Sequence, residues 1–360
     1  SAPPVPQATD ATFLDAAHAW LLLTACDGSD RCTTALEASA DGGATFRALG
    51  AGPQLAARYS AYDLTFATTT DGFLVGPNLW ATHDGGRTWA PAPLAGDVVD
   101  LAAAGSSVWA LTAPCQTVDQ PCPTSEHGPA TLHQSDDAGR TWNAAPTQPP
   151  VTGTMVHTRA ADGFIVGPAT VGGTGPRPSV LAITADGGRT WHQTTAPCSA
   201  DMPPDSAFLS RSPGDGTLWL ACAGQPSAGS QGKAVYRSAD NGHSWTNLAS
   251  CLYNANTCAG TVGGGGYLEG LIAFSAQRAF LLLARGPVLG TTDGGVTWAP
   301  AAPANGCDGV FAPGSAIDST HAWVLSQGPP GCPGAALWTT ADSGTSWTHI
   351  WTEPSSSPAG

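Results

Sequence analysis

One eight-residue pattern, Ser/Thr-x-Asp-x-Gly-x-Thr/Ser-Trp/Phe, occurs seven times in this chain and constrains its fold more than any other feature. The first copy is Ser39–Phe46 and the last is Thr340–Trp347. The spacings between successive aspartates are 43, 53, 49, 54, 53 and 49 residues. A nearly constant period of this length is typical of repeat folds, in which each unit buries its apolar surface against its neighbours. The seven aspartates are Asp41, Asp84, Asp137, Asp186, Asp240, Asp293 and Asp342.

A short apolar segment precedes each copy, as in 18–23, 163–166 and 321–325. These segments are bounded by Gly, Asp and Ser, which is typical of strands buried on both faces. Each repeat therefore predicts four strands, with the motif forming the turn between the third and the fourth. In this turn the Gly supplies a positive φ and the Asp accepts backbone N–H groups. The Trp or Phe is expected to fold back into its own blade and to be buried there.

A lone four-stranded unit cannot bury both of its faces, whereas seven units packed radially can do so. The sequence thus predicts an all-β, seven-bladed β-propeller with four antiparallel strands per blade over residues 10–352. Residues 1–9 are expected to form a Pro-rich tail, and residues 353–360 a flexible tail. The composition agrees, because 45 Gly and 31 Pro suit tight turns. Helix formers such as Glu and Gln are scarce, and lysine occurs only once, at Lys233.

The seven motifs resemble the Asp-box, or bacterial neuraminidase repeat, of sialidase-like propellers. The resemblance covers about residues 10–352. The superfamily includes sialidases, xyloglucan-cleaving glucanases, sortilin-type receptors and photosystem assembly factors. Its boxes are structural turns that lie far from ligand sites. The resemblance therefore implies a structural role for the seven aspartates and specifies the fold rather than the function.

The ten cysteines form five pairs that are close in sequence, and none has the Cys-x-x-Cys spacing with nearby His that is typical of zinc sites. We therefore expect disulfides, which imply an oxidising compartment. The Pro-rich start of the chain resembles a mature end left after removal of a signal peptide. A secreted protein, or one on the exterior of the cell envelope, is predicted. The expected pairs are Cys26–Cys32, Cys115–Cys122, Cys198–Cys222, Cys251–Cys258 and Cys307–Cys332.

The formal net charge is −14, from 27 acidic and 13 basic residues. Such a charge repels phosphate backbones and anionic lipid surfaces, so we expect no nucleic-acid partner. No apolar run reaches the roughly 18 residues of a membrane-spanning helix, so no membrane insertion is expected. No nucleotide-binding loop or metal-spaced group appears among the nine histidines. We expect a monomer without cofactor or metal.

A propeller has two faces, and the cysteines predict which of them carries the ligand. The turn face bears the seven repeat turns and the turns between the first and second strands of each blade. The opposite loop face is expected to carry all five cysteine pairs and the longest insertions, such as 114–130 and 251–267. Long loops on a rigid scaffold commonly bind ligands. Residues at the starts of the inner strands should line the axial mouth of this face. The candidates are Tyr62, Asp97, His157, Arg159, Tyr267 and Glu269.

These features predict a non-catalytic propeller that binds a glycan, peptide or protein at its loop face. The alternative is a glycoside hydrolase, sialidase-like or xyloglucanase-like, with its site at the axial mouth of the same face. Sialidases carry an Arg-Ile-Pro segment and an arginine triad, and this chain has no Arg-Ile-Pro. A carboxylate pair such as Asp97 or Asp100 with Glu269 stays open, because separations across a ring cannot be read from sequence. No catalytic residue is assigned.

Overall fold

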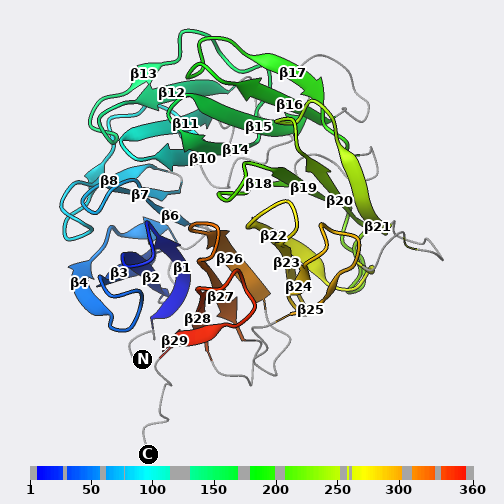
Figure 1. Ribbon diagram of the computed structural model, residues 1–360. Helices are drawn as coiled ribbons and strands as arrows, with labels where there is room; N and C mark the ends of the chain where they lie inside the picture. Colours follow the sequence, from blue (N-terminus) through cyan, green and yellow to red (C-terminus); the bar gives the residue numbers. More distant parts are fainter. Residues whose placement is uncertain are drawn as a thin grey trace, which may run out of the picture.

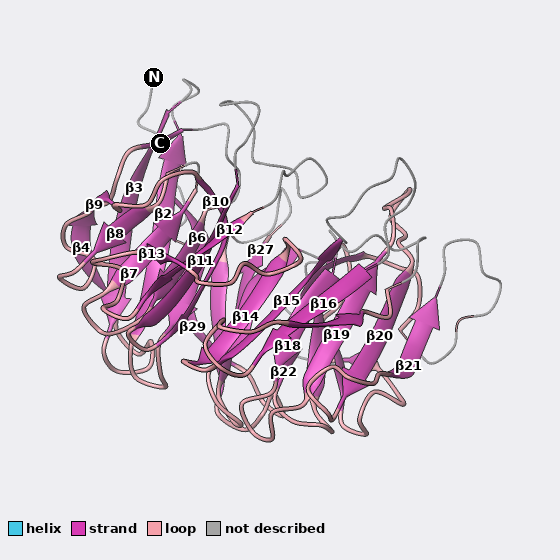
Figure 2. Ribbon diagram, turned by 90° about the horizontal axis from the view of Figure 1, so that it is seen from above, coloured by secondary structure: helices cyan, strands magenta, loops and turns pink. Residues whose placement is uncertain are grey.

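The computed structural model describes residues 6–26, 31–56, 62–76, 78–113, 130–168, 179–198, 207–251, 258, 262–301, 310–328 and 334–353. These residues form strands β1 to β29, and no helix occurs among them (Figure 2). The strands make seven consecutive antiparallel blades of four around a central axis (Figure 1). The structure thus confirms the seven-bladed β-propeller.

Each blade comes from one continuous stretch of chain, and its first strand lies innermost. Blade 1 contains β1 (Gln7–Phe13), β2 (Ala19–Cys26), β3 (Arg31–Ser39) and β4 (Arg47–Ala51), with β5 (Leu55–Ala56) paired to β3. Blade 2 contains β6 (Asp63–Phe66), β7 (Gly72–Val75), β8 (Trp80–Thr82) and β9 (Ala90–Pro91). Blade 3 contains β10 (Asp97–Ala104), β11 (Ser107–Ala113), β12 (Thr131–Ser135) and β13 (Asn143–Ala144). Blade 4 contains β14 (Thr154–Arg159), β15 (Asp162–Pro168), β16 (Ser179–Thr184) and β17 (His192–Thr195).

The remaining three blades complete the ring. Blade 5 contains β18 (Ala207–Arg211), β19 (Leu218–Ala223), β20 (Lys233–Ser238) and β21 (Thr246–Cys251). Blade 6 contains β22 (Tyr267–Ala273), β23 (Ala279–Ala284), β24 (Leu289–Thr291) and β25 (Ala299–Pro300). Blade 7 contains β26 (Val310–Ala316), β27 (Ala322–Gln327), β28 (Ala336–Thr340) and β29 (Thr348–Thr352). Strand β1 begins at Gln7, three residues before the predicted start of the propeller.

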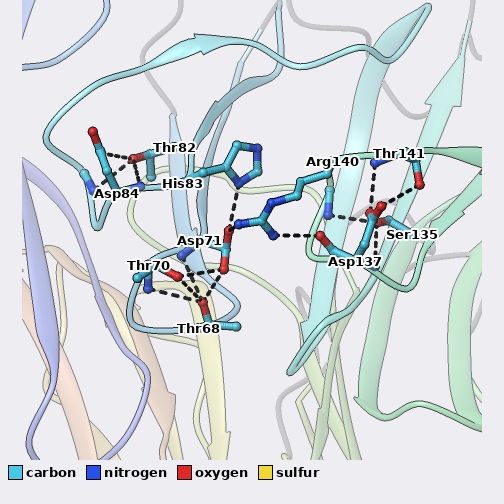
Figure 3. A network of polar contacts seen from close by, with 12 residues as sticks. Thr68, Thr70, Asp71, Thr82, His83, Asp84, Ser135, Asp137, Arg140 and Thr141 are labelled. Atoms are coloured by element: carbon cyan, nitrogen blue, oxygen red, sulfur yellow. Dashed lines mark hydrogen bonds and ion pairs between the residues drawn. The ribbon is translucent and has the colours of Figure 1, made fainter.

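The seven repeat turns share one hydrogen-bond pattern, which blade 3 illustrates (Figure 3). The Ser135 hydroxyl donates to Asp137 Oδ1 over 2.7 Å and accepts the Gly139 N–H over 2.8 Å. The Asp137 carboxylate also accepts the N–H and the hydroxyl of Thr141, over 2.9 and 2.7 Å. These hydrogen bonds, the Thr141 hydroxyl foremost, lower the pKa of Asp137 to about 2. The carboxylate is therefore engaged within its own turn.

Two adjacent residues of every repeat turn have a positive φ, whereas the sequence predicted only one. They are the residue after the aspartate and the glycine that follows it. The first position is glycine in four turns, but Ala138, Asn241 and Ser343 occupy it with φ of 56°, 55° and 57°. The second position has a steric reason to be glycine as well. A Cβ on Gly139 would lie 2.4 Å from the ring of Phe73 in the preceding blade.

The apolar core consists of seven clusters, each formed between two neighbouring blades. An aromatic residue of a second strand commonly meets the repeat-turn aromatic of the next blade edge to face. In the Phe73–Trp142 pair the ring centroids are 6.1 Å apart, and in the Trp219–Trp298 pair they are 6.2 Å apart. The prediction that the seven aromatics are buried in their own blades was wrong. Only Trp298 is fully buried, and the others are half-buried against the preceding blade.

Polar contacts also join neighbouring blades on the turn face, as Asp71 shows (Figure 3). Its carboxylate accepts the hydroxyls of Thr68 and Thr70 from its own turn. It also contacts His83 Nδ1 over 2.8 Å and, from the next blade, Arg140 Nη2 over 2.6 Å. Burial alone would raise the pKa of Asp71, but the hydrogen bonds hold it below its usual value. The charged form thus links blades 2 and 3.

Three disulfides lie among the described residues, and each is at the loop face. They are Cys26–Cys32, Cys198–Cys222 and Cys251–Cys258. Cys26 ends β2, and Cys251 ends β21. The expected pairs Cys115–Cys122 and Cys307–Cys332 fall outside the described residues.

Candidate functional site

A cavity of about 660 Å³ lies on the propeller axis. The inner strands of blades 1 to 5 and 7 line it, mainly through their second halves and the turns that follow. Those turns lie beside the repeat turns, since the N–H groups of Gly42 and Gly85 donate to the carbonyls of Ala17 and Thr70. The cavity is therefore at the turn-face end of the axis. The sequence had placed the site at the opposite end.

The cavity combines apolar walls with polar groups of both charges. Phe13, Phe66 and Trp323 supply aromatic surface. Asp10 and Asp63 lie on the inner strands β1 and β6, towards the middle of the axis. The cationic side chains come from blades 4 and 5, at the ends of β14 and β18. A concave site with a few convergent polar groups is typical of ligand-binding pockets.

Three inner-strand carboxyls influence one another: Asp10, Asp63 and Asp100. Burial and the nearby charge of Asp63 raise the pKa of Asp10 well above its usual value. Desolvation by the surrounding protein also raises the pKa of Asp63, although its side chain is exposed to the cavity. The pKa of Asp100 rises to about 7 through burial, and repulsion from Asp63 adds to the rise. Like charges that share a poorly solvated site disfavour each other's ionised form.

Arg211 and Arg159 form the cationic side of the cavity. The side chain of Arg211 is 9% exposed, and its guanidinium is 3.1 Å from Asp162 and 5.5 Å above the Phe164 ring. Its Nε is buried and has no hydrogen-bond partner among the described residues. Arg159 is 70% exposed and lies 4.0 Å from the same Asp162 carboxylate.

His157 has a structural role in the wall of the cavity. Its ring stacks on Trp109 with centroids 4.1 Å apart. Its Nε2 is 3.0 Å from Ser107 Oγ, and its Nδ1 is 2.9 Å from the Asp162 carbonyl oxygen. Burial lowers its pKa, so the neutral ring is favoured. Both ring nitrogens are thus engaged with protein groups.

The six predicted ligand residues do not form one cluster. His157 and Arg159 lie near the end of β14 and line the axial cavity. Tyr62 precedes β6, is buried, and packs its ring against Gly76. Asp97 starts β10 and is half-buried. Neither of these last two lines the cavity, although Tyr62 directly precedes Asp63, which does.

Tyr267 and Glu269 also lie at the loop-face end, on β22. The Tyr267 hydroxyl accepts the N–H of Gly229 over 2.9 Å, and the guanidinium of Arg285 is 5.6 Å above its ring. Glu269 is exposed, although partial desolvation by the protein raises its pKa. The pair therefore belongs to an ordered part of the loop face, and neither residue lines the axial cavity.

The only lysine of the chain braces that part of the loop face. Lys233 is fully buried, and its Nζ donates to the carbonyls of Gln231, Gly264, Gly265 and Gly266 over 2.8 to 3.3 Å. Burial lowers its pKa to about 8, which keeps it mostly protonated at neutral pH. The ammonium thus ties the segment before β22 to β20.

One repeated sequence pattern marks two of the axial carboxyls. The phrase Asp-x-Thr-Phe occurs at Asp10–Phe13 and again at Asp63–Phe66, at the same point of consecutive repeats. Arg211 carried no comparable signal, because its role depends on contacts with blade 4. Within the described residues no group of three His, Cys, Asp or Glu side chains is arranged to hold a metal ion. The same part of the chain has no helix long and apolar enough to cross a membrane.

No protein-family model matches the chain, and no curated protein matches it. Several solved structures match the chain. YCF48 bound to D1 peptide is 18% identical with a TM-score of 0.55, over 94% of each chain. YCF48 from Cyanidioschyzon merolae is 13% identical with a TM-score of 0.57, over 96% of this chain and 98% of the other. The β-propeller domain of the Trilobed protease from Pyrococcus furiosus is 9% identical with a TM-score of 0.57, over 98% and 99%.

At these identities the similarity shows the propeller fold alone. In this chain blade 1 contains only N-terminal strands and blade 7 only C-terminal strands, and an apolar cluster including Leu21 and Trp323 joins the two blades. The assignment of the repeats to the sialidase-like superfamily stays a prediction.

Proposed function

We propose that this chain is a non-catalytic binding propeller that holds a segment of a peptide or protein in its axial cavity. The observation that carries this proposal is the cavity itself, about 660 Å³, into which polar groups of both charges converge from several blades. Pockets of roughly 300–1,000 Å³ with a few placed polar groups are typical of ligand sites. A peptide occupant is supported by YCF48, a propeller solved with a bound D1 peptide.

The test begins with a library of random heptapeptides displayed on phage and selected on the immobilised protein. Selected peptides are then titrated against Ser315→Trp, because Ser315 is exposed on the cavity wall and a Trp there would fill the space. Affinity should fall about tenfold or more. Ser319→Trp is the matched control, since it adds the same bulk at an exposed turn outside the cavity lining. Equal affinity of both variants would show that the axial cavity is not the site.

The loop face is the second location that the proposal allows, for a glycan as well as for a peptide or protein. It is supported by the braced surface around Tyr267 and Glu269, where Lys233 and the Cys251–Cys258 disulfide fix the neighbouring segments. Peptides that tolerate Ser315→Trp but lose affinity with Tyr267→Ala and Glu269→Ala would place the site there. A glycan array probed with the same variants extends the test to sugars.

Glycoside hydrolysis is the competing function, and one observation favours it. Asp10 and Asp63 lie in the same cavity and both have raised pKa values, as a general acid requires. However, both oxygens of Asp10 accept backbone N–H groups, so only Asp63 is available to a substrate. We expect no turnover of fluorogenic sialosides or xyloglucan oligosaccharides. Turnover that disappears in Asp63→Asn would establish an enzyme instead.

We also propose that the protein works outside the cell or on the exterior of its envelope. The three disulfides among the described residues are consistent with an oxidising compartment. Fractionation of the producing cells, followed by detection with an antibody, tests this location. Recovery of the protein mainly from a reducing cytosol, with its thiols free, would contradict it.

A further inference from the structure

The three axial carboxyls occupy one register position on consecutive blades. Asp10 pairs with Leu22 of its second strand, Asp63 with Val75, and Asp100 with Leu111. In each of these blades one residue of the second strand pairs with the first Ser or Thr of the repeat motif. These residues are Ala19, Gly72 and Val108. The residue that pairs with the aspartate lies three positions further along the same strand. The three aspartates therefore point to a common level of the axis.

Two of these carboxylates are engaged with the backbone, and the third is not. Asp10 accepts the N–H of Ala11 over 2.7 Å and that of Leu64, in the next blade, over 2.6 Å. Asp100 does the same with Leu101 and with Met155 of the next blade. Asp63 is exposed towards the cavity, and no described residue donates a hydrogen bond to its carboxylate.

No cation within the described part of the chain forms an ion pair with any of the three. The cationic side chains that line the same cavity are Arg159 and Arg211, and both contact Asp162. His157 is held neutral by burial. Asp63 is thus a carboxylate in a confined site, repelled by Asp10 and Asp100 and without a compensating partner among these groups.

A second polar group of the cavity also lacks a partner. Arg211 lines the cavity with a side chain that is 9% exposed, and its Nε–H is buried without an acceptor among the described residues. An unmade hydrogen bond at a buried donor is costly. The Nε of Arg211 has almost no accessible surface, so a ligand supplies its acceptor only when the guanidinium turns towards the cavity. The two unmet groups have opposite requirements, because Asp63 needs a cation and Arg211 needs an acceptor.

From these two unmet groups we infer that the axial cavity recognises a basic residue of a peptide, whose ammonium or guanidinium group binds Asp63 while a backbone carbonyl accepts from Arg211. This inference rests on the proposed function and specifies its ligand. A residue with both groups is a Lys or Arg within a chain, whereas a simple amine offers only the cation. The net charge of −14 favours the approach of such a basic segment.

Protons should compete with a cationic guest for the Asp63 carboxylate. The raised pKa values of Asp10, Asp63 and Asp100 mean that part of this cluster is protonated in mildly acidic solution. A cationic guest requires the ionised form of Asp63, so its binding must release protons. The affinity for a basic peptide should therefore rise between pH 5.5 and pH 8. A neutral guest should show no such rise.

The experiment uses the blocked tripeptide acetyl-Gly-Lys-Gly-amide and its neutral counterpart with norleucine in place of lysine. Binding to the full chain is titrated by ligand-observed NMR at both pH values. At pH 8 the lysine peptide should bind about tenfold more tightly than the norleucine peptide. Asp63→Asn should remove that preference, and Asp97→Asn, a carboxyl at the loop-face end of β10, should retain it. Butylammonium should bind more weakly than the lysine peptide, because it offers no carbonyl.

Equal binding of the two tripeptides, or no saturable binding of the lysine peptide at millimolar concentration, overturns the inference. A preference for lysine that survives Asp63→Asn overturns it as well. Asp63→Asn should fold, since no described group donates to that carboxylate. Because the substitution removes the charge that repels Asp10 and Asp100, it should raise the melting temperature at pH 8. Asp63→Ser repeats the test if the amide fails to fold. The proposed function fails separately, when library-selected peptides are indifferent to Ser315→Trp.

Discussion

Substitutions at two adjacent residues of the blade 3 repeat turn should change the free energy of unfolding in opposite directions. Ala138 has a φ of 56°, which costs a non-glycine residue about 1–2 kcal/mol. Ala138→Gly removes this strain, but the freer unfolded chain offsets about 0.5–1 kcal/mol of it. The net expectation is a gain in the free energy of unfolding of about 0.5 kcal/mol.

Gly139→Ala should be strongly destabilising. Its φ of 83° disfavours a side chain, and the new Cβ would lie 2.4 Å from two ring atoms of Phe73, which is fully buried against Trp142. Backbone strain of about 1 kcal/mol and overpacking of about 1–3 kcal/mol give an expected loss of about 2–4 kcal/mol. The two neighbouring substitutions should thus differ by about 2.5–4.5 kcal/mol.

Urea unfolding with disulfides intact, followed by tryptophan fluorescence and checked by calorimetry, measures both changes. The slopes must be compared as well, since a seven-unit protein need not unfold in one step. Ala44→Gly is the matched control, because Ala44 is an exposed residue of a repeat turn without a positive φ. It should lose up to about 1 kcal/mol. If Ala138→Gly behaves like this control, or if Gly139→Ala is harmless, the account of the turn is wrong.

Asp186→Ala should lower the midpoint of urea unfolding, because the Thr190 N–H and hydroxyl lose their acceptor within the turn. It should leave the affinity of library-selected peptides unchanged, and a large loss of affinity at constant stability would contradict the structural role of the turn. In a pH series, the melting temperature should be higher at pH 5 than at pH 8. The raised pKa of Asp100, about 7, means that the folded state binds more protons than the unfolded state above about pH 4, so stability falls as pH rises through this window. Below about pH 4 the melting temperature should fall again, since repeat-turn carboxyls with a pKa of about 2 stabilise only while ionised. Lys233→Met should speed proteolysis before β22, because four carbonyls lose their shared donor; unchanged cleavage would count against the brace. Thiol titration of the denatured, unreduced chain should find essentially no free thiol among its ten cysteines, and a substantial titre would refute the pairing.

The repeats allowed the fold to be predicted because their information is local. The spacing of seven motifs indicates seven blades, and each apolar segment indicates one buried strand. The positive φ of the residue directly after the aspartate was harder to predict, since Ala138, Asn241 and Ser343 do not favour it by themselves. The burial of the turn aromatics was mispredicted because their partners belong to the preceding blade. That contact joins residues such as Phe73 and Trp142, which the repeat pattern cannot pair.

The candidate site was less predictable because it is assembled from several blades. Residues 157 and 159 were assigned to the start of an inner strand, but β14 begins at Thr154 and places them at the opposite end. The orientation of Asp10 depends on an irregularity in strand pairing between Ala8 and Asp10. Such a bulge re-aims the side chains that follow it and leaves no clear mark in sequence.

The crystal structure of the protein with a library-selected peptide would show where the peptide binds. We expect peptide density in the axial cavity at the turn face, with a basic side chain against Asp63 and a backbone carbonyl near Arg211. Density confined to the loop face around Tyr267 and Glu269, with the axial cavity holding only water, would contradict it.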